Sequence, residues 1–141
     1  MRVMAVDYGD TRTGVAFSDL TGTIAGETMT IEERESGRLA KKLAELYASR
    51  GAELVALGLP LNMNGTRGPR AEKSEALAER LRRAGLEVRM IDERLTTVAA
   101  HSIMAEDGIS GKKRTGRIDA VAATLILETC LGMLKNGQAL K

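Results

Sequence analysis

Residues 4–18 read MAVDYGDTRTGVAFS, and this stretch decides how the rest of the chain is interpreted. One apolar run ends in Asp7, and a second follows Gly14. Two such runs joined by a short glycine-containing segment predict adjacent strands connected by a tight turn. Glycines beside a carboxylate let a bulky group approach the backbone, and an acid placed there can hold a metal ion against a phosphate. The alternative is an ordinary hairpin in which Asp7 is a turn residue.

The length and composition predict one globular domain, residues 1–141, with one core. Aromatic residues make up only 2% of the chain, so aliphatic side chains and methionine must fill the interior. No segment approaches the roughly 20 apolar residues of a membrane-spanning helix, and Asp7 and Asp10 interrupt the first apolar run too early for a signal peptide. The single cysteine, Cys130, cannot form an internal disulfide. We therefore expect a cytoplasmic protein without a membrane partner.

The apolar pattern predicts alternating strands and helices along the chain. We expect strands at residues 2–8, 13–18, 27–31, 53–59 and 86–91, and helices at residues 36–50, 69–84, 96–106 and 118–134. The first three strands should form an antiparallel meander. The two later strands, each reached through a helix, should add in parallel by right-handed crossovers. The expected fold class is α/β, with one mixed sheet and helices on both faces.

Acidic residues follow the predicted strands at one edge of this sheet, where sites form in parallel-type sheets. Asp7 ends the first strand, and Asp92 and Glu93 follow the last. Asp119 opens the last helix, where its charge would also suit the helix dipole. Clustered carboxylates persist as anions when cations bind among them, and hard oxygen ligands favour Mg²⁺ or Mn²⁺. The pattern indicates metal-assisted hydrolysis of phosphodiester bonds.

Basic residues gather in a second segment, although the net charge of the chain is only +2. Residues 109–118 read ISGKKRTGRI and contain no acid. We expect a mobile loop there that contacts phosphate, the alternative being a loop that is merely solvated. In residues 67–83, by contrast, arginines and a lysine alternate with glutamates, which is typical of a solvated helix face.

Four segments carry a family resemblance, and they occur in order over nearly the whole chain: VDYGDTRTGVA, LGLPLNMNG, DERLTT and RIDAVAATLIL. Together they resemble the YqgF family, also called RuvX, of the ribonuclease H-like superfamily. The resemblance implies a five-stranded mixed sheet in the order 3-2-1-4-5. It also implies a metal-dependent nuclease that matures the 5′ end of the small-subunit ribosomal RNA precursor.

The resemblance assigns roles to individual residues. Asp7, Glu93 and Asp119 match the family's acids, and they are the expected catalytic groups and the ligands of Mg²⁺ or Mn²⁺. Adjacent strand residues point in opposite directions, so either Asp92 or Glu93 faces the metal, and the family match favours Glu93. The expected substrate contacts are Arg12, Asn62, Asn64, Arg94, Lys112, Lys113, Arg114 and Arg117.

Asn64 and Arg94 could also have roles other than direct substrate contact. Asn64 stands where many relatives have Asp, so we expect its loop to position the substrate backbone rather than to bind metal. Arg94 could instead form a salt bridge behind the acids.

Other functions stay open beside a nuclease acting on structured RNA. Branched DNA is the alternative substrate, and a Holliday-junction resolvase should be a homodimer because it cuts two strands symmetrically. A catalytically inactive nucleic-acid-binding module is a third possibility, for which Asn64 is the only argument. An actin-like ATPase would need a second phosphate loop and an adenosine pocket, for which this length leaves little room.

Overall fold

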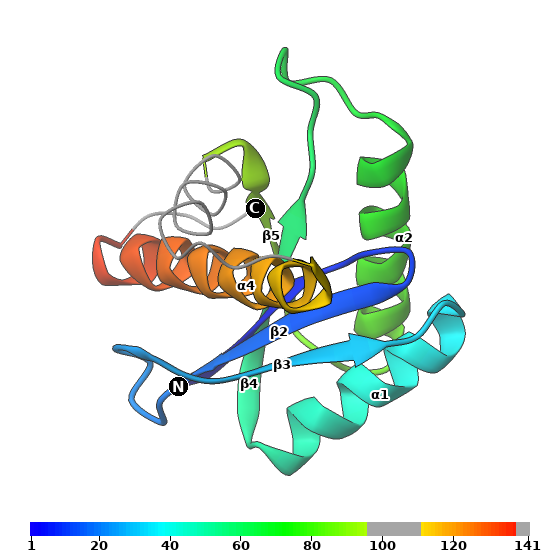
Figure 1. Cartoon of the computed structure of the whole chain (residues 1–141). Coiled ribbons are helices and arrows are strands. Elements are labelled where there is room, and N and C mark those ends of the chain that lie inside the picture. Colours follow the sequence, from blue (N-terminus) through cyan, green and yellow to red (C-terminus); the bar gives the residue numbers. More distant parts are fainter. Residues whose placement is uncertain (96–110, 138–141) are drawn as a thin grey trace.

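The computed structural model describes residues 1–95 and 111–137, with the side chains of residues 95 and 111–119 left out. The chain forms a mixed sheet, a short 3₁₀ turn and long helices (Figure 1). The strands are β1 (Arg2–Asp7), β2 (Arg12–Ser18), β3 (Ala25–Glu32), β4 (Ala52–Leu59) and β5 (Val88–Asp92). The helices are α1 (Ser36–Ser49), α2 (Pro69–Arg83), the 3₁₀ turn η1 (Glu93–Leu95) and α4 (Gly111–Lys135).

The five strands lie in the order β3-β2-β1-β4-β5, which confirms the order expected from the family resemblance. The β1–β2 and β2–β3 pairs are antiparallel, whereas β1–β4 and β4–β5 are parallel. The ends of β1, β3, β4 and β5 and the start of β2 therefore share one edge of the sheet, called here the carboxyl rim.

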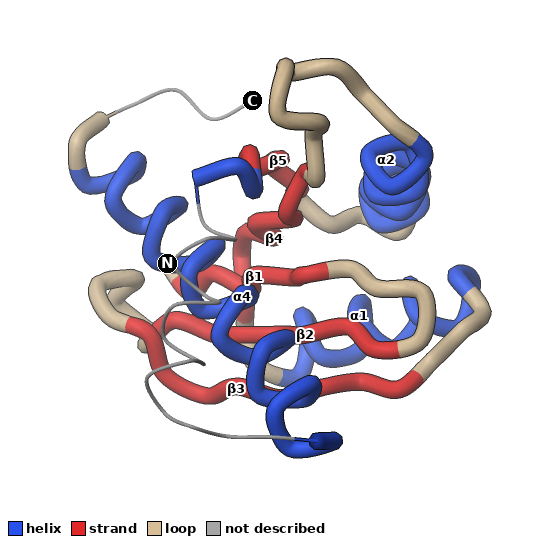
Figure 2. Tube along the Cα trace, turned by 45° about the horizontal axis from the view of Figure 1, so that its top comes forward, coloured by secondary structure: helices blue, strands red, loops and turns tan. Residues whose placement is uncertain are grey.

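Helices cover both faces of the sheet, as predicted (Figure 2). Strand alternation sends Met4 and Val6 of β1 to one face, where α1 and α2 pack through Leu39 and Leu77. Residues Val3 and Ala5 point to the opposite face, which α4 covers with a stripe of small and branched side chains that includes Ala123, Ile126, Leu127 and Cys130. Burying Cys130 this deeply raises the pKa of its thiol to about 11, so it behaves as a core residue.

Local sequence signals explain where the helices on the first face begin and end. The side chain of Glu35 caps α1 by accepting hydrogen bonds from the backbone N–H groups of Gly37 and Arg38, at 2.9 and 2.8 Å. Pro69 occupies the first turn of α2, and Gly85, with a φ of +94°, lies just beyond its end.

The structure differs from the expected boundaries mainly at the last helix. That helix begins at Gly111 rather than near residue 118, so residues 111–118 of the basic segment expected as a loop lie within α4. Lysine and arginine are good helix formers, and one interior glycine costs only about 1 kcal/mol, so Gly116 does not stop the helix. The helix expected at residues 96–106 lies outside the described residues. Within the described part of the chain, no helix is long and apolar enough to cross a membrane.

Candidate active site

Asp7 is the last residue of β1, and it follows Val3 and Ala5 on the face covered by α4. Its partner across the antiparallel pair is Gly14, which has no side chain to crowd the carboxyl group. The turn after β1 is equally tight, because a Cβ at Gly9 would collide with the carbonyl oxygen of Arg12. The sequence-predicted strand–turn–strand unit therefore holds Asp7 half-buried at the carboxyl rim.

Glu93 reaches the same place from β5 by passing over β4. It is the first residue of η1, directly after the end of β5, and its exposed fraction is only 9%. Its side chain crosses the backbone of Gly58, where a Cβ would lie 2.8 Å from Glu93 Cδ and 2.7 Å from Ile126 Cδ1. Gly58 thus leaves the space that Glu93 occupies beneath α4.

The carboxyl groups of Asp7 and Glu93 meet in a hydrogen bond, although 86 positions separate them in the chain. Burial, followed by the charge and hydrogen bond of Glu93, raises the pKa of Asp7 to about 8. Burial also raises the pKa of Glu93, while the hydrogen bond from Asp7 opposes that shift. At neutral pH a protonated Asp7 donates to the Glu93 carboxylate. Two negative charges so close together repel each other, so either a shared proton or a bound cation stabilises the pair.

Arg70 supplies positive charge to this pair, and the sequence reasoning missed it. Its guanidinium lowers the pKa of both Asp7 and Glu93, opposing the effect of burial. The charge pattern of residues 67–83 indicated only a solvated helix face. A usable signal was present, because Arg70 directly follows the Pro69 that begins α2, and the loop before α2 leaves the end of β4 at the carboxyl rim.

Asp92 has a different environment from its neighbour Glu93. The guanidinium of Arg94 donates to it, with Nη2 2.7 Å from Oδ2 and Nε 3.1 Å from Oδ1. Arg94 Nη1 also lies 3.4 Å from the carbonyl oxygen of Met63, which ties this ion pair to the loop after β4. Of the two adjacent acids, Glu93 is therefore the one that faces Asp7, and the salt bridge considered for Arg94 is present.

The loop at residues 60–68 is ordered by its own polar side chains. The amide of Asn62 donates to Thr66 Oγ1 at 3.0 Å, and Gly65 N donates to Asn62 O at 2.8 Å. Asn64 Oδ1 accepts from both the backbone N–H and the hydroxyl of Thr66, at 3.0 and 2.6 Å. This engagement suits a residue that shapes the loop, and the substrate contacts expected of Asn62 and Asn64 stay predictions.

The remaining expected site residues lie on β2 and α4. Arg12 begins β2 at the carboxyl rim, with its Nε 3.8 Å from Glu32 Oε1. Lys112, Lys113, Arg114, Arg117 and Asp119 belong to the first turns of α4, and their side chains are outside the description. Among the side chains that are described, no three metal-ligating groups come together. Asp7 and Glu93 are the two expected metal ligands whose side chains are described, and their metal role stays a prediction.

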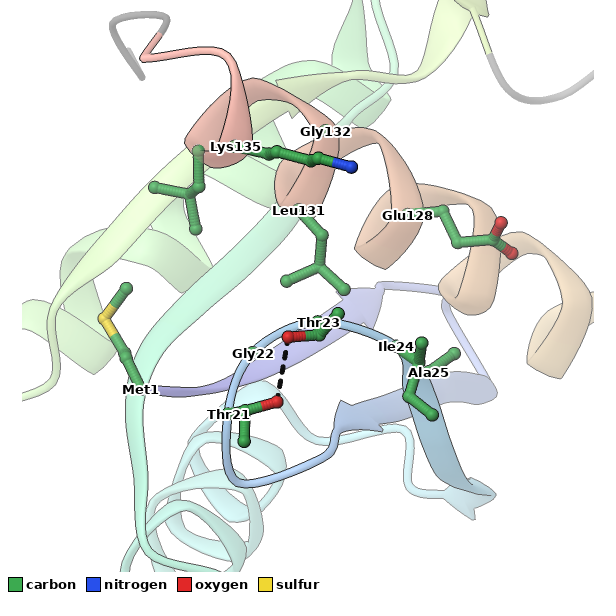
Figure 3. Close-up of a pocket in the computed structure, with 11 residues that line it drawn as sticks. Met1, Thr21, Gly22, Thr23, Ile24, Ala25, Glu128, Leu131, Gly132 and Lys135 are labelled. Atoms are coloured by element: carbon green, nitrogen blue, oxygen red, sulfur yellow. Dashed lines mark hydrogen bonds between the residues drawn. The ribbon is translucent and has the colours of Figure 1, made fainter.

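A pocket of about 760 Å³ lies away from these acids, and Figure 3 shows its walls. Met1 precedes β1, and Ile24 and Ala25 lie at the start of β3, so this pocket is at the opposite edge of the sheet from the carboxyl rim. Leu131 and Lys135 from the end of α4 close it. The pocket contains none of the predicted site residues.

The sheet order and the helices on both faces define a ribonuclease H-like fold. Solved structures of that class resemble this chain throughout. Thermus thermophilus RuvC in complex with a Holliday junction substrate has a TM-score of 0.60 at 14% identity, covering 100% of this chain and 99% of that one. The Fowlpox virus resolvase in complex with Holliday junction DNA has a TM-score of 0.62 at 12% identity, covering 95% and 99%. At these identities the likeness establishes the fold alone.

Sequence comparison identifies the family within this class. The model of the RuvX family, described as Holliday junction resolvase, matches residues 1–133. A protein of Moorella thermoacetica is 44% identical over 139 residues, covering 97% of this chain and 99% of its own. One of Ruminiclostridium cellulolyticum is 40% identical over 140 residues, covering 98% and 99%. Both are named "Putative pre-16S rRNA nuclease".

The chain belongs to the RuvX family, as its sequence motifs indicated. The enzyme class expected from the sequence, a hydrolase acting on ester bonds, is confirmed at the level of the family, since these relatives are named nucleases.

Proposed function

We propose that this chain, acting as one domain in the cytoplasm, is a divalent-metal-dependent nuclease that processes the 5′ end of the small-subunit ribosomal RNA precursor. One observation carries the proposal: the half-buried Asp7 and the buried Glu93, from opposite halves of the sequence, meet as a carboxyl pair at the carboxyl rim. Bringing two carboxyl groups together in this environment costs folding free energy. Groups with pKa values perturbed in this way are typical of catalytic sites.

The residues present fit a Mg²⁺ or Mn²⁺ ion. Two adjacent buried carboxyl groups with raised pKa values offer the hard oxygen ligands that these ions prefer, and a cation would replace the shared proton. Asp92, engaged by Arg94, is the less suitable ligand. A divalent ion bound there supplies activation of water and stabilisation of the leaving oxygen in phosphodiester hydrolysis.

Asp119 is the proposed third ligand and catalytic acid. By helical periodicity, position 119 falls on the same face of α4 as Ala123 and Ile126, which pack on the sheet. Ile126 lies against Gly58 at the acid pair, and position 119 is two turns closer to the start of α4. The basic residues Lys112, Lys113, Arg114 and Arg117 precede it, and we propose that they and Arg12 hold substrate phosphates.

Structured RNA is the proposed substrate because the similar curated proteins are named for pre-16S rRNA. The family description favours one second candidate, resolution of branched DNA junctions by a homodimer. Cleavage of a precursor-rRNA 5′-end fragment and of a four-way DNA junction, measured side by side with Mg²⁺ and Mn²⁺, separates the two. Exclusive cleavage of the junction by a protein that sediments as a dimer would favour the resolvase.

The variant Asp7→Asn tests the proposed site. It should abolish metal-dependent cleavage while nucleic-acid binding is retained, because one metal ligand is lost without a change in shape. Glu53→Gln is the matched control, since Glu53 is an exposed acid at the other end of β4 and should leave cleavage unchanged. Undiminished Mn²⁺-dependent cleavage by the Asp7 variant would reject the assignment.

A further inference from the structure

A groove of about 420 Å³ lies at the carboxyl rim on the face of the sheet covered by α1 and α2, opposite the face that carries the acid pair. Tyr8, which follows Asp7, forms one wall, and Lys73 and Arg80 of α2 form another. Arg34 and Ser36, from the end of β3 and the start of α1, complete it. The turn between β1 and β2 lies beside α2 (Figure 1), and an ion pair of 3.0 Å between Asp10 and Lys73 joins them at the surface.

Three cations of α2 lie between this groove and the acids. Positions 70, 73 and 80 fall within a narrow arc of a helix, so Arg70, Lys73 and Arg80 share one side of α2. Arg70 acts electrostatically on Asp7 and Glu93, whereas Lys73 and Arg80 line the groove. Positions 70 and 80 are about 15 Å apart along the helix axis, which is a length of a few nucleotides of a single strand.

The charge balance of the groove is positive because Arg34, Lys73 and Arg80 line it together with a single acid, Asp10. Asp10 is paired with Lys73, and Glu35 is held by the backbone N–H groups at the start of α1. Within the described part of the chain, the side chains of Arg34 and Arg80 have no salt-bridge partner, and both residues are exposed. Unpaired arginines bind phosphate oxygens strongly.

We propose that this groove binds the backbone of a single-stranded segment that flanks the scissile bond, a role that rests on the proposed nuclease function. The strand passes from the acid pair over the carboxyl rim at Arg70 and continues along α2, where Arg34 and Arg80 contact its phosphates. Tyr8 is one of only three aromatic residues in the chain, and it gives the groove the combination of ring and cations found in single-strand sites.

The test measures binding rather than cleavage, in the Asp7→Asn background. Fluorescence anisotropy gives the affinity for an RNA hairpin with single-stranded extensions and for the same hairpin with blunt ends. The variant R34A/R80A is compared with K41A/R83A, which removes the same charge from exposed positions of α1 and α2 outside the groove. A third variant, R34K/R80K, keeps the charges.

Removing two phosphate contacts should make the log–log salt dependence shallower by about 1.4 for a single strand. The affinity lost by R34A/R80A on the extended hairpin should therefore be about sevenfold greater at 50 mM than at 200 mM salt. The lysine variant should restore most of the slope, and thermal unfolding of all variants checks that each is folded. The blunt hairpin and K41A/R83A should show no such change.

An equal loss with the blunt hairpin, an equal loss in K41A/R83A, or an unchanged slope would each overturn the groove assignment. The proposed nuclease function can fail independently of the groove assignment. If the wild-type protein cleaves no RNA or DNA but its binding still depends on Arg34 and Arg80, the nuclease proposal is wrong and the groove assignment stands. Absence of binding to either hairpin would overturn both.

Discussion

Replacing Gly58 with alanine is the sharpest single test of how the acid pair is built. The new Cβ would lie 2.7 Å from Ile126 Cδ1, 2.8 Å from Glu93 Cδ and 2.9 Å from Glu93 Cγ. Carbon atoms in contact prefer about 3.5–4.0 Å, so these groups must move apart by roughly 1 Å. The end of Ile126 can turn away, but Glu93 is closed in by α4 and β4, and its carboxyl group is held by Asp7.

The expected cost follows from these two displacements. Overpacking one methyl group in a well-filled core destabilises a protein by about 1–3 kcal/mol. A displacement of about 1 Å at a catalytic group can lower the rate by about 100-fold. Gly58→Ala should therefore unfold at lower denaturant concentration, bind Mn²⁺ more weakly and lose about two orders of magnitude in cleavage rate.

The control is Gly132→Ala in α4, where a Cβ would meet no atom within 4 Å. Removing a glycine from a helix interior should stabilise the protein by about 0.5–1 kcal/mol and leave cleavage unchanged. Chemical denaturation, calorimetric Mn²⁺ titration and cleavage kinetics compare the two variants. Wild-type metal affinity and rate in Gly58→Ala would refute the inference that Glu93 reaches Asp7 over this glycine.

Two further predictions concern the protonation of the pair. The pKa of Asp7 is raised from 3.8 to about 8, so the folded metal-free protein binds more protons than the unfolded chain between these pH values and should lose stability as pH rises from about 4 to 8. Denaturation at a series of pH values checks this, and Asp7→Asn should flatten the curve; a metal-free wild type that gains stability over this interval would contradict it. Arg70→Ala should raise the pKa of the pair further, because its positive charge opposes the shift, and NMR titration of the carboxyl carbons would show no change if Arg70 does not act on them.

The sequence predicted the fold well because strand and helix periodicities are local signals. The strand–turn–strand unit around Asp7, the buried β4 and the helix that begins at Pro69 all appear where expected. The order of the strands followed from the family resemblance. The start of α4 was misplaced because Gly108, Gly111 and Gly116 suggested a loop, whereas the intervening lysines and arginines favour a helix.

The site was predictable in its acids but not in its supporting groups. An acid at the end of a strand is visible in the sequence, so Asp7 and the Asp92–Glu93 pair could be named. The choice between Asp92 and Glu93 depends on where β5 ends and on the Arg94 ion pair, neither of which periodicity determines. Gly58 fell within the strand expected at residues 53–59 and was given no role of its own, because its importance comes from a side chain that arrives from another strand.

The raised pKa values of Asp7 and Glu93 have a structural cause, which also limits which groups can neutralise the two carboxylates. Water is excluded by α4 on one side, and the backbones of Gly14 and Gly58 let the two carboxyl groups approach without intervening side chains. Arg70 compensates only in part, since the pKa of Asp7 still rises to about 8 with that guanidinium nearby. A compact divalent cation, the ligand proposed for this site, would satisfy the two carboxylates in place of the shared proton. The stability of the metal-free protein at alkaline pH, where that proton is lost, is therefore the quantity that a bound ion should restore.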